Sequence, residues 1–139
     1  MKILVVSAHP DDEVIGMGGT LKKLSKSNQI KVLFLADGIT ARKQGGHKNS
    51  SNYEPTNLQK QQMKKEIEIR KKHAARALSV LGIKNMRFLD LPDNELDIVP
   101  FLKIVKEIER EISSTKCDID RKSTRLNSSH LGISYAVFC

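Results

Sequence analysis

The residues with the clearest chemical potential form one short stretch, His9-Pro10-Asp11-Asp12-Glu13. His9 and Asp12 are three residues apart, in a turn that Pro10 constrains. An imidazole nitrogen and a carboxylate oxygen are both good zinc ligands, and this spacing lets both face one ion. Asp11 lies between them and can point elsewhere, so its carboxylate could take a proton from a water activated by the metal. Glu13 could hold one of the metal ligands in position without binding the metal itself.

The same stretch has a second interpretation, as an acidic turn whose carboxylates only cap the helix that follows. Gly16, Gly18 and Gly19 come next and would let the backbone approach a ligand closely, or would serve plain packing between strand and helix. Their phase does not match the Gly-x-Gly-x-x-Gly pattern of dinucleotide sites. From these residues alone, a metal site and a helix cap both remain open.

The elements that would position this turn alternate between strands and helices. Apolar, β-branched runs predict strands at 2–7, 30–36 and 86–91, and the opening of a fourth at 117–119. Helical spacing of apolar residues predicts three helices between them. This order is typical of an α/β fold with a mainly parallel sheet covered by helices on both faces. In such sheets the chemistry lies beyond the carboxyl ends of the strands, where the turn at His9 falls.

Several residues mark the ends of these helices. The first helix is expected at about 14–27, with Met17, Leu21 and Leu24 on one stripe. Thr56 with Gln59 predicts a capping box for the second helix, and Gly82 suits its end. Asp97 is expected to cap the third helix, with Pro100 in its first turn. The stripe of this helix would comprise Phe101, Ile104, Val105, Ile108 and Ile112. A long polar loop separates the second strand from the second helix.

Composition narrows the class of protein. The chain has 139 residues, of which 39% are hydrophobic and 29% charged, as expected of one soluble domain with a real core. No apolar run is long enough for a membrane helix or a signal peptide, so a cytoplasmic location is expected. Two cysteines do not make a disulfide framework. The net charge is +8, but the basic residues have acidic neighbours along the sequence, which is typical of a solvated surface. Aromatic residues make up only 4% of the chain, so nucleic acid is not expected as a partner. A basic surface would still favour an anionic substrate.

A family resemblance supports the metal interpretation. The stretch Ala8–Glu13, followed by Gly16-Met17-Gly18-Gly19-Thr20, resembles the signature of the PIG-L/LmbE-like zinc-dependent de-N-acetylases. Asp37-Gly38 after the second strand, Ala77 to Gly82 and Leu89 to Asp97 add to it. The resemblance covers residues 1–119. It implies a Rossmann-like three-layer sandwich and a hydrolase that acts on N-acetylated amino sugars or their conjugates.

The resemblance also implies roles for individual residues. His9 and Asp12 would bind zinc, Asp11 would be the general base, and zinc-activated water would attack the acetamide carbonyl of an N-acetylglucosamine-type substrate. Arg42 would hold a substrate hydroxyl or phosphate, and Asp93 and Asn94 would shape the site. For these three, a solvated loop arginine and ordinary turn chemistry remain the alternatives. A different class also stays open: a non-catalytic α/β domain that binds a sugar or a nucleotide.

The chain departs from the family pattern towards its end. The family takes a third zinc ligand from a His-x-x-His-type motif after the fourth strand, and no such motif follows residue 119. His47 and His73 are expected to be solvated. Residues 120–130 and 133–139 resemble the translation of a common short-read sequencing adapter, and His130 lies inside this text. We therefore expect 1–119 to be the N-terminal part of a LmbE-like deacetylase domain and 120–139 to be an artefact.

Two consequences follow from this expectation. Without residues 120–139, three basic residues and one acidic residue disappear, which lowers the net charge to +6. With two of the usual three protein ligands, we expect the fragment to bind zinc weakly and to have no useful activity. The sequence carries no indication of the oligomeric state.

Overall fold

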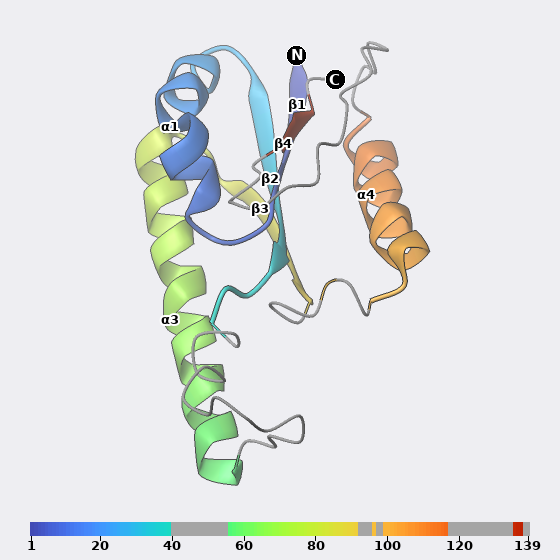
Figure 1. Cartoon of the computed structure of the whole chain (residues 1–139). Helices are drawn as coiled ribbons and strands as arrows, with labels where there is room; N and C mark the ends of the chain where they lie inside the picture. Colours follow the sequence, from blue (N-terminus) through green and yellow to red (C-terminus); the bar gives the residue numbers. More distant parts are fainter. Residues whose placement is uncertain (40–55, 92–95, 97–98, 117–134, 138–139) are drawn as a thin grey trace.

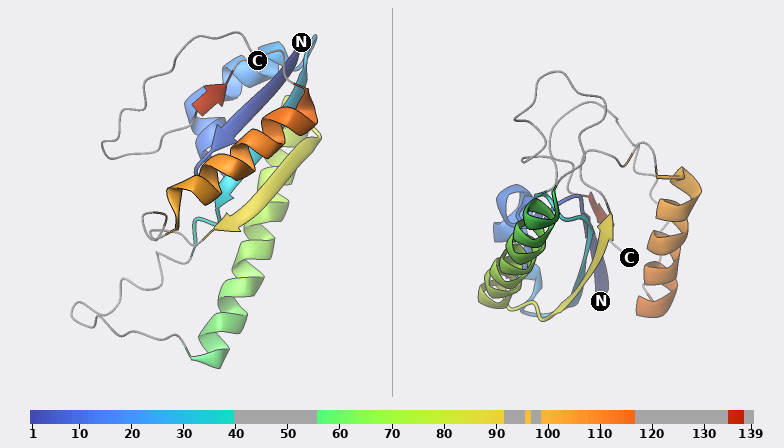
Figure 2. Two further views of the ribbon diagram at one scale, coloured as in Figure 1. Left: turned by 90° about the vertical axis from the view of Figure 1, so that its right-hand side faces the viewer. Right: turned by 90° about the horizontal axis from the view of Figure 1, so that it is seen from below.

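The protein has an α/β fold in which helices cover both faces of one sheet, as the computed structural model shows for residues 1–39, 56–91, 96, 99–116 and 135–137 (Figure 1). The elements in chain order are β1 (Lys2–Ser7), α1 (Asp12–Leu24), β2 (Gln29–Ala36), α3 (Asn57–Leu81), β3 (Asn85–Leu91), α4 (Phe101–Thr115) and β4 (Tyr135–Val137). Helices α1 and α3 lie on one side of the sheet and α4 on the other (Figure 2). The predicted fold class is confirmed.

The sheet has the strand order β3-β2-β1-β4. Strand β2 pairs in parallel with both β1 and β3, so the carboxyl ends of these three strands share one edge. The register of β1 and β2 runs from Lys2 opposite Gln29 to Ser7 opposite Phe34. Strand β4 pairs antiparallel with the middle of β1. It lies within the segment expected to be foreign, whereas the fourth strand predicted at 117–119 falls outside the described residues.

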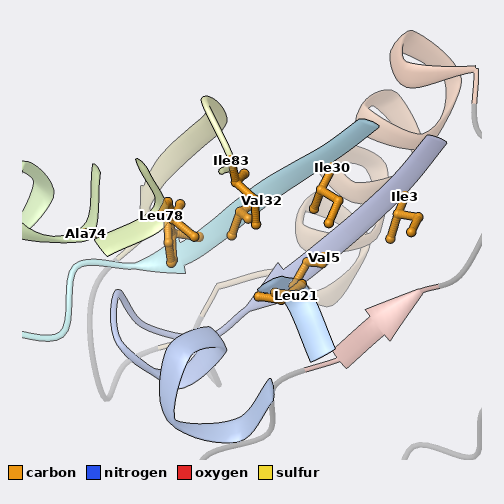
Figure 3. Packing of buried hydrophobic residues seen from close by; sticks show 9 residues of the cluster. Ile3, Val5, Leu21, Ile30, Val32, Ala74, Leu78 and Ile83 are labelled. Atoms are coloured by element: carbon orange, nitrogen blue, oxygen red, sulfur yellow. The ribbon is translucent and has the colours of Figure 1, made fainter. Parts of the chain in front are cut away.

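The larger core fills the space between the sheet and helices α1 and α3 (Figure 3). Alternate side chains of β1 and β2 point to this side, which is the period-two pattern of a strand. They pack against the inner faces of the two helices. The buried members are Ile3, Val5, Leu21, Ile30, Val32, Phe34, Ala74, Leu78 and Ile83. Phe34 also stacks on Phe88 of the neighbouring strand, with 4.8 Å between ring centroids.

The opposite face has a smaller apolar core and a buried charge network. Leu4, Val6 and Leu33 are buried there, and Ile108 and Ile112 of α4 pack against them. The predicted stripe of α4 is wrong at Phe101, which is 71% exposed. Glu111 is instead only 3% exposed. Glu111 is the residue of α4 that is most deeply buried against the sheet. The spacing of apolar residues did not predict this, because it considers apolar side chains only.

Both predicted ends of α3 are confirmed, whereas α1 ends at Leu24 rather than near residue 27. Thr56 and Gln59 form the capping box of α3, and Gly82 ends that helix in the left-handed conformation. Helix α4 starts later than expected, because Pro100 occupies its N-cap position rather than its first turn. Asp97, the expected cap, falls outside the described residues. None of the helices in the described part of the chain is long and apolar enough to cross a membrane.

Helix α1 begins at Asp12, inside the acidic motif, rather than at residue 14 as the spacing predicted. Its path is broken at Met17, whose φ of −148° and ψ of 19° are not helical. A Cβ on Gly19 would meet nothing within 4 Å, and one on Gly18 would make only ordinary contact with Val14. Neither glycine is therefore required for close packing in this structure. The early start places the whole acidic motif at the junction of β1 and α1.

Candidate active site

The acidic motif forms a compact turn at the carboxyl end of β1. The Ser7 hydroxyl, which is fully buried, donates a hydrogen bond to the carbonyl of His9 at 2.9 Å. The backbone N–H of Ala36 donates to the carbonyl of Ala8 at 2.9 Å, which carries the pairing of β1 and β2 up to the turn. These bonds fix where the motif leaves the sheet. The turn lies at the edge where parallel sheets place their functional groups.

His9 and Asp12 converge within this turn. His9 Nδ1 lies 3.4 Å from Asp12 Oδ2, and the same oxygen accepts the backbone N–H of His9 at 3.0 Å. The side chains are 31% and 18% exposed, so both are partly covered but reachable from solvent. An imidazole nitrogen and a carboxylate oxygen held this close can face one small cation with little rearrangement.

Asp11 adopts an unusual backbone conformation, with φ at 149° and ψ at −29°. Residues other than glycine rarely adopt such positive φ values, and strained residues of this kind cluster at active sites. Asp11 occupies the N-cap position of α1, yet its side chain makes no capping hydrogen bond. Its Oδ2 instead accepts a hydrogen bond from Arg70 Nη2 at 2.7 Å. The carboxylate is therefore directed away from the helix start.

Arg70 is a site residue that the sequence did not reveal as one. It comes from the middle of α3, and its side chain is only 18% exposed. In the sequence of α3, Arg70 stands at helical spacing between Ile67 and Ala74, on the stripe that faces the sheet. A charged residue in that place is the signal that could have found it. Its guanidinium also lies against Gly38, where a Cβ would come within 3.2–3.3 Å of three guanidinium atoms. Arg70 thus connects the turn after β2 to the turn after β1.

Glu13 supports the turn from beneath. Its side chain is fully buried, and its Oε2 accepts the backbone N–H of Asp11 at 3.1 Å. Burial raises the pKa of Glu13, and the backbone hydrogen bonds that its carboxylate accepts only partly oppose this. The Glu13 carboxylate therefore contacts the backbone of Asp11, the residue with the positive φ. Glu13 thereby helps to hold Asp11 in its strained conformation.

A shallow groove of about 310 Å³ runs beside the turn, between α1 and α3. The side chains that line it are apolar apart from Asp11, Glu13, Arg70 and His73. His73 is exposed, as the sequence predicted. The Asp11 carboxylate thus pairs with Arg70 and also borders the open groove.

The sequence of residues 4–120 matches the PIG-L family, described as GlcNAc-PI de-N-acetylases. The chain belongs to this family. It is 33% identical over 116 residues to the diacetylchitobiose deacetylase of Thermococcus kodakarensis, an alignment that covers 80% of this chain and 34% of that protein. The chain therefore spans about a third of the length of this curated relative.

Solved structures agree with the family assignment. The N,N'-diacetylchitobiose deacetylase of Pyrococcus horikoshii, determined with an inhibitor, superposes with a TM-score of 0.56 at 29% identity, over 80% of this chain and 36% of that one. The 4-carboxy-2-hydroxymuconate hydratase of Pseudomonas putida superposes with a TM-score of 0.57 at 18% identity, over 83% of this chain and 43% of that one. The second likeness concerns the fold alone.

The metal that the PIG-L family implies finds two fitting donors in this chain. His9 and Asp12 supply the nitrogen and oxygen types that zinc prefers, and they already converge. Within the described part of the chain, no group of three or more His, Cys, Asp or Glu side chains could hold a metal ion. Arg42, Asp93 and Asn94, together with His47 and His130, lie outside the described residues. The donor chemistry fits a divalent ion that takes a further ligand from elsewhere.

Proposed function

We propose that the protein carrying this chain is a metal-dependent hydrolase that removes the acetyl group from an N-acetylglucosamine-type sugar. The observation that carries the proposal is the convergence of His9 Nδ1 and Asp12 Oδ2 to 3.4 Å at the carboxyl edge of the sheet. The family and the two diacetylchitobiose deacetylases support the substrate class. His9 and Asp12 would hold the ion. When bound, such an ion polarises a carbonyl oxygen and makes water a nucleophile near neutral pH.

Asp11 is the base in this proposal. Its carboxylate would accept a proton as a water oxygen forms a bond to the acetamide carbon. It would then return the proton to the amine nitrogen as the C–N bond breaks, which yields acetate and a free amino sugar. Arg70 would hold Oδ2 of this carboxylate, and Glu13 would hold its backbone. Both contacts fix the position of the base before the substrate arrives.

The non-catalytic interpretation makes a different demand on the same residues. A turn that only caps a helix would have the Asp11 side chain accept a backbone N–H of the first turn of α1. No such bond is present, and Asp11 instead adopts a strained conformation and pairs with a residue of another helix. These features favour a site that holds a carboxylate in place for chemistry.

The proposal is tested by acetate release from N,N'-diacetylchitobiose by the whole protein that carries this chain. Asp11→Asn is expected to keep the bound metal and to lower kcat by about 10²–10⁴-fold, the usual worth of a general base. Glu109→Asn, on the exposed side of α4, is the matched control and should leave the rate unchanged. Undiminished acetate release after removal of all metal would reject the mechanism, and near-normal turnover in Asp11→Asn would remove Asp11 from its role.

A further inference from the structure

The amino ends of the strands form a second surface, at the opposite edge of the sheet from the candidate active site (Figure 1). Two adjoining hollows of about 490 and 780 Å³ lie there, and both are lined by Lys2, Asn28 and Gln29. We define the lysine edge as the five lysines that line these hollows. They are Lys2, Lys26, Lys31, Lys84 and Lys116. No aspartate or glutamate is among the described residues that line either hollow.

Most of these lysines pair with no acid in the ranges that the structure describes. Lys31 pairs with Glu111 at 2.5 Å. The other four lysines of the lysine edge form no ion pair within the described part of the chain. Several cations elsewhere do have partners, as in Lys71 with Asp90 at 2.7 Å and Arg110 with Glu107 at 2.6 Å. Lysines without an ion pair also occur elsewhere in the described part of the chain, as at Lys60 and Lys64 of α3. The lysine edge differs in that its lysines line two adjoining hollows with no acidic residue among the described lining.

The partial negative charges at the carboxyl ends of the helices are too small to balance the charge of these lysines. Helices α1, α3 and α4 all end at this edge, and each helix carboxyl end carries roughly half a negative charge. Three such ends would offset about 1.5 of the four unpaired positive charges, which leaves an excess of about 2.5. The excess is larger than one carboxylate would neutralise. It is close to the charge of about −1.5 to −2 that a phosphate monoester carries near pH 7.

We propose that the lysine edge binds a phosphate group, carried either by a soluble phosphate ester or by an anionic lipid headgroup. Lysine ammonium groups bind phosphate as mobile point charges, which suits an open hollow. The exposed side chains of Gln29 and Asn85 line the smaller of the two hollows, and their amides can donate further hydrogen bonds. No aromatic side chain lines either hollow among the described residues, so stacked nucleic-acid bases are not the expected ligand. The proposal does not depend on the activity proposed above.

The first test measures binding of inorganic phosphate to the full chain by calorimetry. The double variant Lys26→Gln with Lys84→Gln removes one charge from each hollow and is expected to weaken binding about tenfold, since exposed charge pairs are each worth only a modest amount. Lys60→Gln with Lys64→Gln is the control, because both residues are exposed on the amino half of α3, away from this edge (Figure 1). Absence of phosphate binding together with absence of vesicle binding, or equal weakening in the control, would overturn the proposal.

Vesicles separate the two sources of phosphate. Sedimentation with phosphatidylcholine vesicles is compared with sedimentation with vesicles that also contain phosphatidic acid. Retention only by the acidic vesicles, lost in Lys26→Gln with Lys84→Gln, would assign a lipid headgroup. Binding of soluble phosphate without retention on vesicles would assign a soluble ester.

Thermal unfolding provides a second readout that helix capping alone would not produce. Phosphate should raise the Tm of the unchanged chain and have less effect on the double variant, because a ligand stabilises the state that binds it. Without phosphate, the double variant should be at least as stable as the unchanged chain. A lower Tm for the variant with an unaltered phosphate effect would show that these lysines serve only the helix ends.

Discussion

The two edges of the parallel strands differ in charge and in how that charge is held. At the carboxyl edge, Asp11, Asp12 and Glu13 are each held by a named partner in a rigid turn. At the amino edge, five lysines line open hollows, and four of them form no ion pair with any described residue. A strand of six residues spans about 20 Å, which exceeds the screening length of about 8 Å at physiological salt. The two edges therefore act as electrostatically separate sites.

The difference follows from how a parallel sheet is built. The parallel strands β1, β2 and β3 all leave the sheet at the same edge, so the residues that follow β1 and β2 lie close together. The motif at His9 and the turn at Gly38 come together in this way, and Arg70 closes the gap between them. The amino edge receives the carboxyl ends of helices α1, α3 and α4 instead. The lysines therefore lie at the amino edge, and the acidic turn lies at the carboxyl edge.

The largest expected effect on stability comes from Glu111, whose carboxylate pairs with Lys31 of the lysine edge. Its carboxylate binds Lys31 of β2 and Arg87 of β3 while only 3% of the residue is exposed. Glu111→Ala would leave both cations without this partner, so the free energy of unfolding should fall by about 3 kcal/mol. Chemical denaturation measures this change. Glu109→Ala on the exposed side of the same helix is the control and should change stability little.

The same residue predicts a dependence on pH. Burial alone would raise the pKa of Glu111, but the interactions with Lys31 and Arg87 outweigh it and hold the pKa below its ordinary value. Its contribution is therefore present above the unfolded pKa and is lost as pH falls through the lower folded pKa. The difference between the unchanged chain and Glu111→Ala should shrink in acid. A difference that grows in acid would contradict this account. The variant should also bind phosphate more tightly, because Lys31 is freed.

A smaller effect is expected at Gly38, on the carboxyl edge. Its φ of 73° strains any other residue, and a Cβ would press on the Arg70 guanidinium. Gly38→Ala should lower the free energy of unfolding by about 1–2 kcal/mol. It should also slow acetate release by the whole protein, because Arg70 would no longer hold Asp11 in place. Gly19→Ala is the matched control, since a Cβ there meets nothing within 4 Å and alanine favours a helix. Equal losses in both variants would remove the link between Gly38 and the site.

Strands β1, β2 and β3 and both ends of α3 were predictable because they depend on neighbouring residues. The apolar run of β1 and the Thr56–Gln59 box carry their structure locally, as does the left-handed Gly82. The contact of Arg70 with Asp11 was not predictable, because 59 residues separate the two partners. Periodicity assigned Arg70 to the inward face of α3 but could not identify what it meets there. The burial of Glu111 was not predictable for the same reason, since its partners Lys31 and Arg87 lie on strands β2 and β3.

The candidate site divides in a similar way. Spacing marked His9, Asp11, Asp12 and Glu13 as candidates but left a helix cap open, and the family resemblance favoured the metal site. The structure keeps all four residues in one turn. Their detailed arrangement depends on φ of Asp11 and on the burial of Glu13, which spacing does not encode. The two alternatives that the sequence left open, metal site and helix cap, differ in where the Asp11 side chain points. Only the fold supplied that direction.

We propose above that His9 and Asp12 together bind one metal ion. Zinc titration of the whole protein, followed by calorimetry, tests it most directly. We expect about one zinc per protein, and we expect His9→Ala or Asp12→Ala to weaken binding by more than about a hundredfold, because even a residue behind a ligand is worth 10–100-fold. His73→Ala, an exposed histidine beside the same groove, should leave the affinity unchanged. Zinc affinity that survives His9→Ala and Asp12→Ala undiminished would contradict the account.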